Sequence, residues 1–207
     1  MQSKLVCCVI ICSLLFPSGA RAQGEALDDV MQHVPMAAVF ALKAGGVENQ
    51  SALGTLDREE SWIELIATAG ATYLIGTGVT YGLKHTVREW RPDDSDRRSF
   101  PSGHAMYAFA GATTLYHEYG HISPWVTVSG FGTAALVAAD RVRRDRHYLH
   151  DVCAGAAIGV LSAELTYYIK KRYIKPKIVA HSHQGRRRSG GIDVAFTGQS
   201  VSLLARW

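Results

Sequence analysis

Three short polar motifs dominate the middle of the chain: K-H-T-V-R-E-W-R-P (Lys84–Pro92), S-F-P-S-G-H (Ser99–His104) and D-R-V-R-R-D-R-H-Y-L-H-D (Asp140–Asp151). They collect lysine, arginine, histidine, serine and glycine, which bind phosphate oxygens through cationic side chains and backbone amides. Long uncharged segments precede the first motif and follow the other two. We therefore expect these segments to form helices that hold the three motifs around one anion.

The uncharged segments have the length and composition of helices, and short connections join them, which predicts a helical bundle and an all-α fold. The four segments are Leu65–Leu83, His104–Tyr116, Ile122–Ala139 and Val152–Ile169, the last of which is interrupted by Glu164. Ala26–Leu42 is expected to add one or two short helices around Pro35, and Asp93–Arg98 to form a charged loop. Residues 192–204 partly alternate between apolar and polar side chains, which predicts a short strand-like tail.

The N-terminus has the features of a secretory signal. Lys4 provides the positive charge, Leu5–Phe16 is apolar but short for a membrane span, and Ala20-Arg21-Ala22 has the form of a cleavage site. We expect residues 1–22 to be a signal peptide; the alternative is an uncleaved anchor. Only Cys153 lies outside this segment, so the mature chain forms no internal disulfide, and we expect Cys153 to be buried.

The net charge of +4 is concentrated locally rather than spread along the chain. Residues 170–188 carry eight lysines and arginines and no acidic residue. The simplest interpretation is a solvated helix end and loop, and the alternative is contact with anionic lipid headgroups. Nucleic acid is not an expected partner, because aromatic residues do not alternate with these basic ones.

The first two motifs contain residues suited to holding an anion. Lys84 and Arg91 are seven positions apart, so on one helix they would share a face, with Pro92 ending that helix. Ser102 is placed to cap the following helix, whose first amides point toward an anion. Gly103 allows close approach of the backbone. His104 would project toward the bound group.

The third motif pairs a histidine with a carboxylate. Arg141 lies six residues before His147, and Asp151 lies four residues after it, which is about one helical turn. Such a pair fixes the imidazole tautomer and raises its basicity. We expect the intervening residues 143–146 to be mostly solvated. His150 has no role in this pattern.

Together the motifs resemble the type 2 phosphatidic acid phosphatase (PAP2) superfamily, which includes lipid phosphate phosphatases, bacterial class A acid phosphatases and vanadium haloperoxidases. All ten motif positions are present in order: Lys84, Arg91, Pro92, Pro101, Ser102, Gly103, His104, Arg141, His147 and Asp151. Asp140 stands where the family usually has serine. We expect either weaker phosphate binding or a turn of Asp140 toward a neighbouring arginine.

The resemblance implies a helical bundle of the PAP2/haloperoxidase type and a mechanism without metal or cofactor. His147 would attack phosphorus to form a phosphohistidine, and Asp151 would orient His147. His104 would protonate the leaving alkoxide and then activate water. The phosphate oxygens would be held by Lys84, Arg91, Arg141 and the amides of Ser102 and Gly103. Because His147 must be neutral and His104 protonated, we expect a bell-shaped pH–rate profile.

Together with the signal sequence, the long apolar segments and the basic residues 170–188, the resemblance implies a phosphatase of the bacterial cell envelope. Its expected substrate is a lipid phosphate such as phosphatidate, phosphatidylglycerophosphate, a polyprenyl pyrophosphate or a lipid A phosphate, met at a membrane surface. The expected location is the periplasm or the inner membrane, with the site on the periplasmic side. Residues 23–178 would form the phosphatase domain, and residues 179–207 a basic loop and tail. The alternatives are a soluble periplasmic acid phosphatase acting on small phosphomonoesters, a vanadium haloperoxidase, and a non-catalytic binding protein.

Overall fold

The computed structural model describes residues 29–47, 62–174, 192–197 and 200–205. The signal peptide expected at residues 1–22 lies outside these residues. The chain divides into two compact units, Met1–Tyr168 and Ile169–Trp207.

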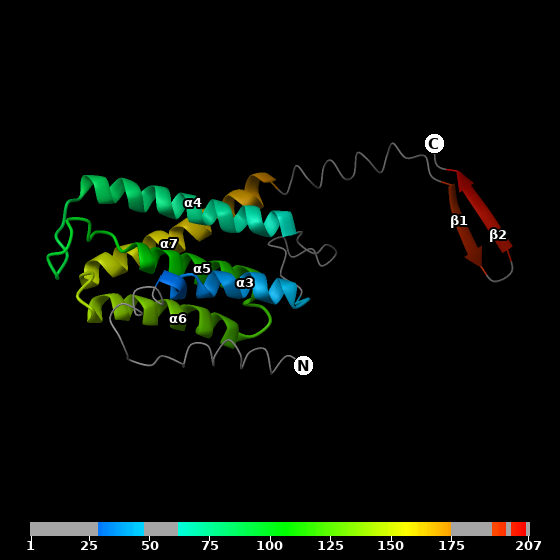
Figure 1. The fold of residues 1–207 in the computed structure, drawn as a ribbon. Helices are drawn as coiled ribbons and strands as arrows, with labels where there is room; N and C mark the ends of the chain where they lie inside the picture. The colour runs from blue at the N-terminus through cyan, green and yellow to red at the C-terminus, as the bar shows by residue number, and fades with distance from the viewer. Residues whose placement is uncertain (1–28, 48–61, 175–191, 198–199, 206–207) are drawn as a thin grey trace. The chain divides into compact units, whose positions relative to one another are not determined.

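The first unit is a bundle of helices that run roughly side by side (Figure 1). They are α3 (Val34–Ala44), α4 (Trp62–Thr86), α5 (Gly103–Tyr119), α6 (Pro124–Arg143) and α7 (Leu149–Ile169), the last of which ends just past the unit boundary. The predicted all-α bundle is confirmed. Residues 29–31 form one more helical turn, and Pro35 lies in the first turn of α3, where proline is well accommodated.

Serine side chains fix the start of two helices. The Ser102 Oγ accepts a hydrogen bond from the Ala105 amide at 3.5 Å, so the predicted cap of α5 is present. The Ser123 Oγ accepts one from the Trp125 amide at 3.3 Å, and Pro124 begins α6. Both caps satisfy amides that have no partner within the helix. The charged loop predicted at Asp93–Arg98 is confirmed as part of a longer connection between α4 and α5.

Helix α5 lies inside the bundle and forms its core, with 11 of its 17 residues buried. Two clusters of buried apolar residues surround it: Met36, Ala38, Val39, Leu65, Ala69, Leu115, Tyr119 and Val126 form one, and Ala108, Ala112, Ala134 and Val137 form the other. Small side chains on α5 let the neighbouring helices approach closely. The packing therefore depends on helix backbones as much as on large apolar groups.

Glycines of α7 bring its backbone against α5. A Cβ added at Gly155 would lie 2.2 Å from the Ser102 carbonyl oxygen, and one added at Gly159 would lie 2.3 Å from the Met106 carbonyl oxygen. Both distances are far below ordinary van der Waals contact. Only glycine fits at these two positions without moving a helix. The N-terminal half of α7 is thereby fixed against the start of α5.

The second unit contains a short π-helical turn, η1 (Lys170–Ile174), and a two-stranded hairpin. Strand β1 (Ile192–Thr197) pairs antiparallel with β2 (Ser200–Ala205), and Thr197 lies opposite Ser200 beside the turn. The predicted strand-like tail is confirmed.

Two helices carry large apolar side chains on their exposed surfaces. Ile63, Leu74 and Val79 of α4 are exposed, as are Leu161 and Leu165 of α7. Both helices are long and apolar enough to cross a membrane, a test that core helices of soluble proteins also pass. The predicted burial of Cys153 is wrong, because the thiol side chain is exposed on α7. The run of small residues around it gave no sign of which side faces outward.

Candidate active site

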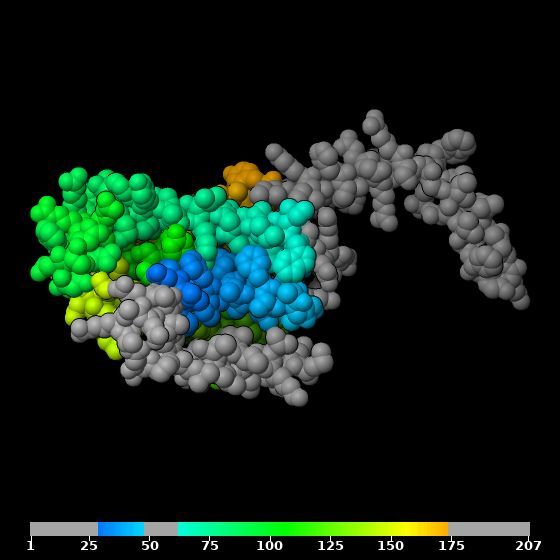
Figure 2. All heavy atoms as spheres, viewed as in Figure 1, coloured from blue at the N-terminus to red at the C-terminus, as the bar shows by residue number. Residues whose placement is uncertain are grey.

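The three motifs meet at one end of the first unit. The end of α4, the start of α5, the end of α6 and the start of α7 all lie at the left of Figure 1. The loop of residues 87–102 joins the first two of these ends, and it forms the green surface at that end of the space-filling view in Figure 2. The fold therefore gathers residues that are far apart in the sequence.

His147 and Asp151 form a buried pair at this end. His147 lies in the turn before α7 and Asp151 in the first turn of α7, and their side chains are 4% and 0% exposed. The His147 Nδ1 lies 3.6 Å from the Asp151 Oδ2. The carboxylate also accepts hydrogen bonds from the Ser99 Oγ at 2.5 Å and from the Tyr148 amide at 2.9 Å. These bonds fix the carboxylate beside the imidazole, as the spacing predicted.

The electrostatic surroundings of His147 show which groups share its site. Burial and then the cations Lys84 and Arg91 lower the pKa of His147, Asp151 opposes them, and the resulting pKa is about 4. His104 also acts on this pKa from nearby. A lowered pKa keeps the imidazole neutral at ordinary pH, so that a ring nitrogen keeps its lone pair.

The turn Pro101–His104 holds the start of α5 against α7. The Ser102 amide donates to the Asp151 carbonyl oxygen at 3.0 Å. The prediction that this amide holds phosphate is therefore wrong. The first bond along the helix runs from the Met106 amide to the Ser102 carbonyl oxygen, so the Gly103 and His104 amides precede it. Space is open beside Gly103, since a Cβ added there would meet no atom within 4 Å.

His104 has a carboxylate partner that the sequence motifs did not indicate. Its Nε2 lies 2.9 Å from the Asp29 Oδ1, and the two side chains are 24% and 69% exposed. Asp29 comes from the helical turn before α3, 75 residues away. The partly exposed imidazole stands at the mouth of the site, in contrast to the buried ring of His147.

Lys84 and Arg91 do not share a helix, contrary to the prediction. Helix α4 ends at Thr86, before Pro92 can act as its terminator, and Arg91 lies in the following loop. The Lys84 Nζ donates to the Arg98 carbonyl oxygen at 2.8 Å, and the Arg91 amide donates to the Asp96 carbonyl oxygen at 2.9 Å. The loop fold, rather than helical spacing, brings both cations near His147.

Arg141 is buried near the end of α6, while Asp140 turns away toward other arginines. The Asp140 carboxylate lies 2.8 Å from the Arg143 Nη2 and 2.9 Å from the Arg144 Nε, against 3.8 Å from the Arg141 Nη2. Burial raises the pKa of Asp140, but the hydrogen bonds and charges of Arg143 and Arg144 outweigh it and hold the pKa below its usual value. The predicted turn of Asp140 toward a neighbouring arginine is confirmed.

Residues 143–146 are less solvated than predicted. Arg144 and Arg146 are each only about one-third exposed, at 29% and 31%, whereas Arg143 is 70% exposed. The Arg146 Nη1 donates to the Asp93 carboxylate at 3.1 Å, which ties the turn between α6 and α7 to the charged loop. Arg146 therefore holds the charged loop in place, while Arg143 and Arg144 neutralise the Asp140 carboxylate.

Three residues around Asp151 were missed by sequence reasoning. Ser99 donates to its carboxylate, and the His150 Nε2 lies 3.2 Å from its Oδ1 and 2.9 Å from Glu89. Ser99 stands within a recognised motif, but 52 residues separate it from Asp151, and 61 separate Glu89 from His150. Glu89, His150 and Asp151 place ligand atoms within 4.8 Å of one another, so these three could hold a metal ion. Their contacts are equally those of a hydrogen-bonded network.

The comparisons with known proteins identify the family. The PAP2 superfamily matches residues 64–175, more than half of the chain, and the chain belongs to that family. Lipid A 1-phosphatase of Porphyromonas gingivalis is 33% identical over 152 residues, 73% of this chain and 32% of that protein. Lipid phosphate phosphatase 1 of Arabidopsis thaliana is 33% identical over 104 residues, 45% of this chain and 30% of that protein. The chain thus spans about a third of the length of these curated relatives.

Two solved structures are similar to this chain. The crystal structure of Aquifex aeolicus LpxE is 19% identical, with a TM-score of 0.47, covering 72% of this chain and 87% of that chain. The transmembrane PAP2 type phosphatidylglycerolphosphate phosphatase from Bacillus subtilis is 21% identical, with a TM-score of 0.45, covering 83% of this chain and 87% of that chain.

Proposed function

We propose that the chain is a metal-independent phosphatase of the cell envelope, which hydrolyses a lipid phosphate through a phosphohistidine at His147. The observation that carries this proposal is the surroundings of His147. A buried, neutral imidazole lies beside the Asp151 carboxylate, and the cations Lys84 and Arg91 are close enough to shift its pKa. Such a site attracts a dianion and presents a nucleophile to it.

The proposed reaction begins with an attack of the His147 Nε2 on phosphorus. The Nδ1 faces Asp151, which stabilises the positive charge that develops on the ring as the N–P bond forms. The distance of 3.6 Å is slightly long for a hydrogen bond and is expected to shorten when the substrate binds. Lys84, Arg91 and Arg141 would neutralise the phosphate oxygens, and the Gly103 and His104 amides would donate to them.

His104 would act on the leaving group from the exposed mouth of the site. It would donate its proton to the alkoxide as the P–O bond breaks, and would then take a proton from the water that cleaves the phosphohistidine. The Asp29 carboxylate, 2.9 Å from the Nε2, holds the ring in place. Asp29 lies outside the three motifs, 75 residues before His104.

Two observations favour a lipid substrate over a soluble ester. The relatives carry the names lipid A 1-phosphatase and lipid phosphate phosphatase. The exposed apolar side chains of α4 and α7 also suit contact with lipid. The site lies at the end of both helices, so a phosphate headgroup would reach it from a membrane surface.

The test is phosphate release by the purified chain, with a chelator present. Short-chain phosphatidate, phosphatidylglycerophosphate and p-nitrophenyl phosphate would be compared in non-ionic detergent, with His147→Ala as the inactive control. We expect turnover of the lipid esters with the higher kcat/KM, and none by His147→Ala. Turnover of p-nitrophenyl phosphate alone would reject the lipid substrate, and an active His147→Ala would reject the mechanism.

A further inference from the structure

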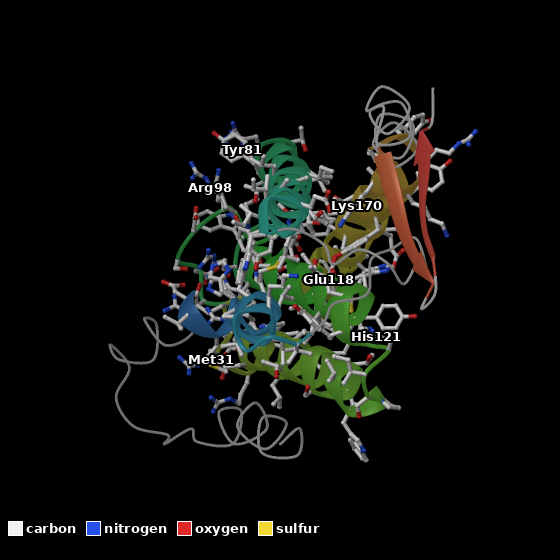
Figure 3. All side chains as sticks on the ribbon, turned by 90° about the vertical axis from the view of Figure 1, so that its right-hand side faces the viewer. Met31, Tyr81, Arg98, Glu118, His121 and Lys170 are labelled. Atoms are coloured by element: carbon white, nitrogen blue, oxygen red, sulfur yellow. The ribbon has the colours of Figure 1, made fainter. Side chains whose placement is uncertain are left out.

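An open cavity of about 440 Å³ adjoins the site at the end of α4 and in the loop after it. Its lining is strongly basic: Lys84, His85, Arg88, Arg97 and Arg98 contribute to it, together with Trp90. Arg98 is labelled in Figure 3, on the same side of the bundle as Tyr81 of α4. Of these residues, only Lys84 belongs to the family's motifs.

The arginines of this cavity differ from those of the third motif in their partners. Arg143, Arg144 and Arg146 each pair with Asp140 or Asp93. Within the described part of the chain, no carboxylate lies within ion-pair distance of Arg88, Arg97 or Arg98. One acidic residue, Asp96, also lines the cavity, against three arginines that stay cationic and Lys84, whose pKa burial lowers to about 8. The cavity therefore keeps a positive charge that the protein itself does not neutralise.

The lining is held in place by contacts that leave its charges available. The Arg97 guanidinium lies over the Trp90 ring, with its central carbon 4.4 Å from the ring centroid. Such stacking orients a guanidinium while leaving its N–H groups free to bind. The Lys84 Nζ donates to the Arg98 backbone oxygen, which fastens the loop to α4. The Arg98 side chain takes no part in that bond.

Lys84 connects the cavity with the reaction site, because it lines the cavity and also shifts the pKa of His147. We propose that the cavity is a second anion subsite, which binds another phosphate carried by the same substrate molecule as the phosphate that His147 attacks. The proposal rests on the proposed phosphatase function and narrows its substrate to amphiphiles with two phosphate groups. Arginine forks bind phosphate in pairs of charge-assisted hydrogen bonds, which suits Arg97 and Arg98 to this role.

The experiment compares two substrates with the same acyl chains. Dihexanoyl phosphatidate carries one phosphate, and dihexanoyl phosphatidylglycerophosphate carries a terminal phosphate and a second, diester phosphate. The enzymes are the wild type, Arg97→Gln, Arg98→Gln and the double variant. Arg143→Gln is the matched control, since it removes an exposed arginine outside the cavity. All are assayed in non-ionic detergent after their folding is checked by circular dichroism.

We expect each cavity variant to lower kcat/KM for the two-phosphate substrate about tenfold, and the double variant to lower it further. For the single-phosphate substrate, kcat/KM should change by no more than about twofold. The control Arg143→Gln should leave kcat/KM unchanged for both substrates, because an exposed, solvated arginine contributes little electrostatic energy. An equal loss for both substrates, or no loss for either, would overturn the subsite.

A binding measurement separates this inference from the proposed function. In a His147→Ala background, dissociation constants for the two lipids are measured with and without the cavity substitutions. If wild-type enzyme hydrolyses neither lipid, the function fails, but selective weakening of two-phosphate binding still supports the subsite. The alternative source of the phosphate in the cavity is a neighbouring anionic lipid in the same micelle. If phosphatidylglycerol added to the micelles stimulates hydrolysis of the single-phosphate substrate, and the double variant removes this effect, the same-molecule assignment is wrong.

Discussion

The contact between α7 and the turn Pro101–His104 allows a prediction about the geometry of the site. In Gly155→Ala, the new Cβ would lie 2.2 Å from the Ser102 carbonyl oxygen, whereas ordinary contacts begin at 3.4 Å. The helix and the turn must therefore separate by about 1 Å, which is the scale of misplacement that lowers enzymatic rates about 100-fold. Asp151 moves directly with this contact, because its carbonyl oxygen accepts the Ser102 amide.

We expect Gly155→Ala to lower kcat/KM for phosphate release about 100-fold while the protein remains folded. Overpacking costs about 1–3 kcal/mol of stability, and the helix propensity of alanine recovers about 1 kcal/mol. Initial rates measure the loss of kcat/KM, and thermal unfolding measures the change in stability. Gly78→Ala is the control, since an added Cβ there meets nothing within 4 Å.

A second variant distinguishes misplacement of the site from general loss of packing. Gly159→Ala creates a similar clash, 2.3 Å from the Met106 carbonyl oxygen, but one helical turn farther from Asp151. It should lower stability about as much as Gly155→Ala and activity much less. The reasoning is refuted if folded Gly155→Ala keeps its rate within about threefold, or if Gly159→Ala loses as much activity.

Three further predictions concern the charges around Asp151. Because the pKa of His147 is lowered to about 4, kcat/KM should fall as the pH drops through that value and the nucleophile becomes protonated. It should also fall toward higher pH as the general acid loses its proton, and a pH–rate profile without these two limbs argues against the assignment. Ser99→Ala should destabilise the protein by about 1.5–3 kcal/mol in urea unfolding, because the carboxylate loses a hydroxyl donor, and an unchanged midpoint would count against that bond. His150→Gln should move the acid limb to higher pH by a fraction of a pH unit. The substitution removes a cation 3.2 Å from the Asp151 carboxylate, and that carboxylate then stabilises protonated His147 more strongly. A shift to lower pH would be inconsistent with this network.

The helices were predictable because their signals are local. An uncharged run of helical length, a capping serine such as Ser102 and a charged loop such as Asp93–Arg98 each determine the structure of only the neighbouring residues. The residues of the three motifs could be named through the family resemblance, and the described structure brings them to one end of the bundle. The interpretation of Asp140 also succeeded, because its arginine partners are three and four residues away.

The remaining contacts of the site depend on tertiary structure. Asp29 reaches His104 across 75 residues and Glu89 reaches His150 across 61, and no periodicity in the sequence records either pairing. The spacing of Lys84 and Arg91 suggested a shared helix, but α4 ends between them. The backbone of the loop sets their positions, and its hydrogen bonds could not be anticipated from residue types. The Ser102 amide was misassigned for the same reason, because its acceptor lies on α7.

Rapid-quench labelling decides whether His147 is the nucleophile. Wild-type protein is mixed with phosphatidate labelled with ³²P, stopped in alkali, where phosphohistidine survives, and digested for peptide mapping. We expect an acid-labile label on the peptide that contains His147, formed and lost at rates compatible with turnover, and no label in His147→Ala. Label on another residue, or steady turnover by His147→Ala, would show that the reaction does not pass through this imidazole.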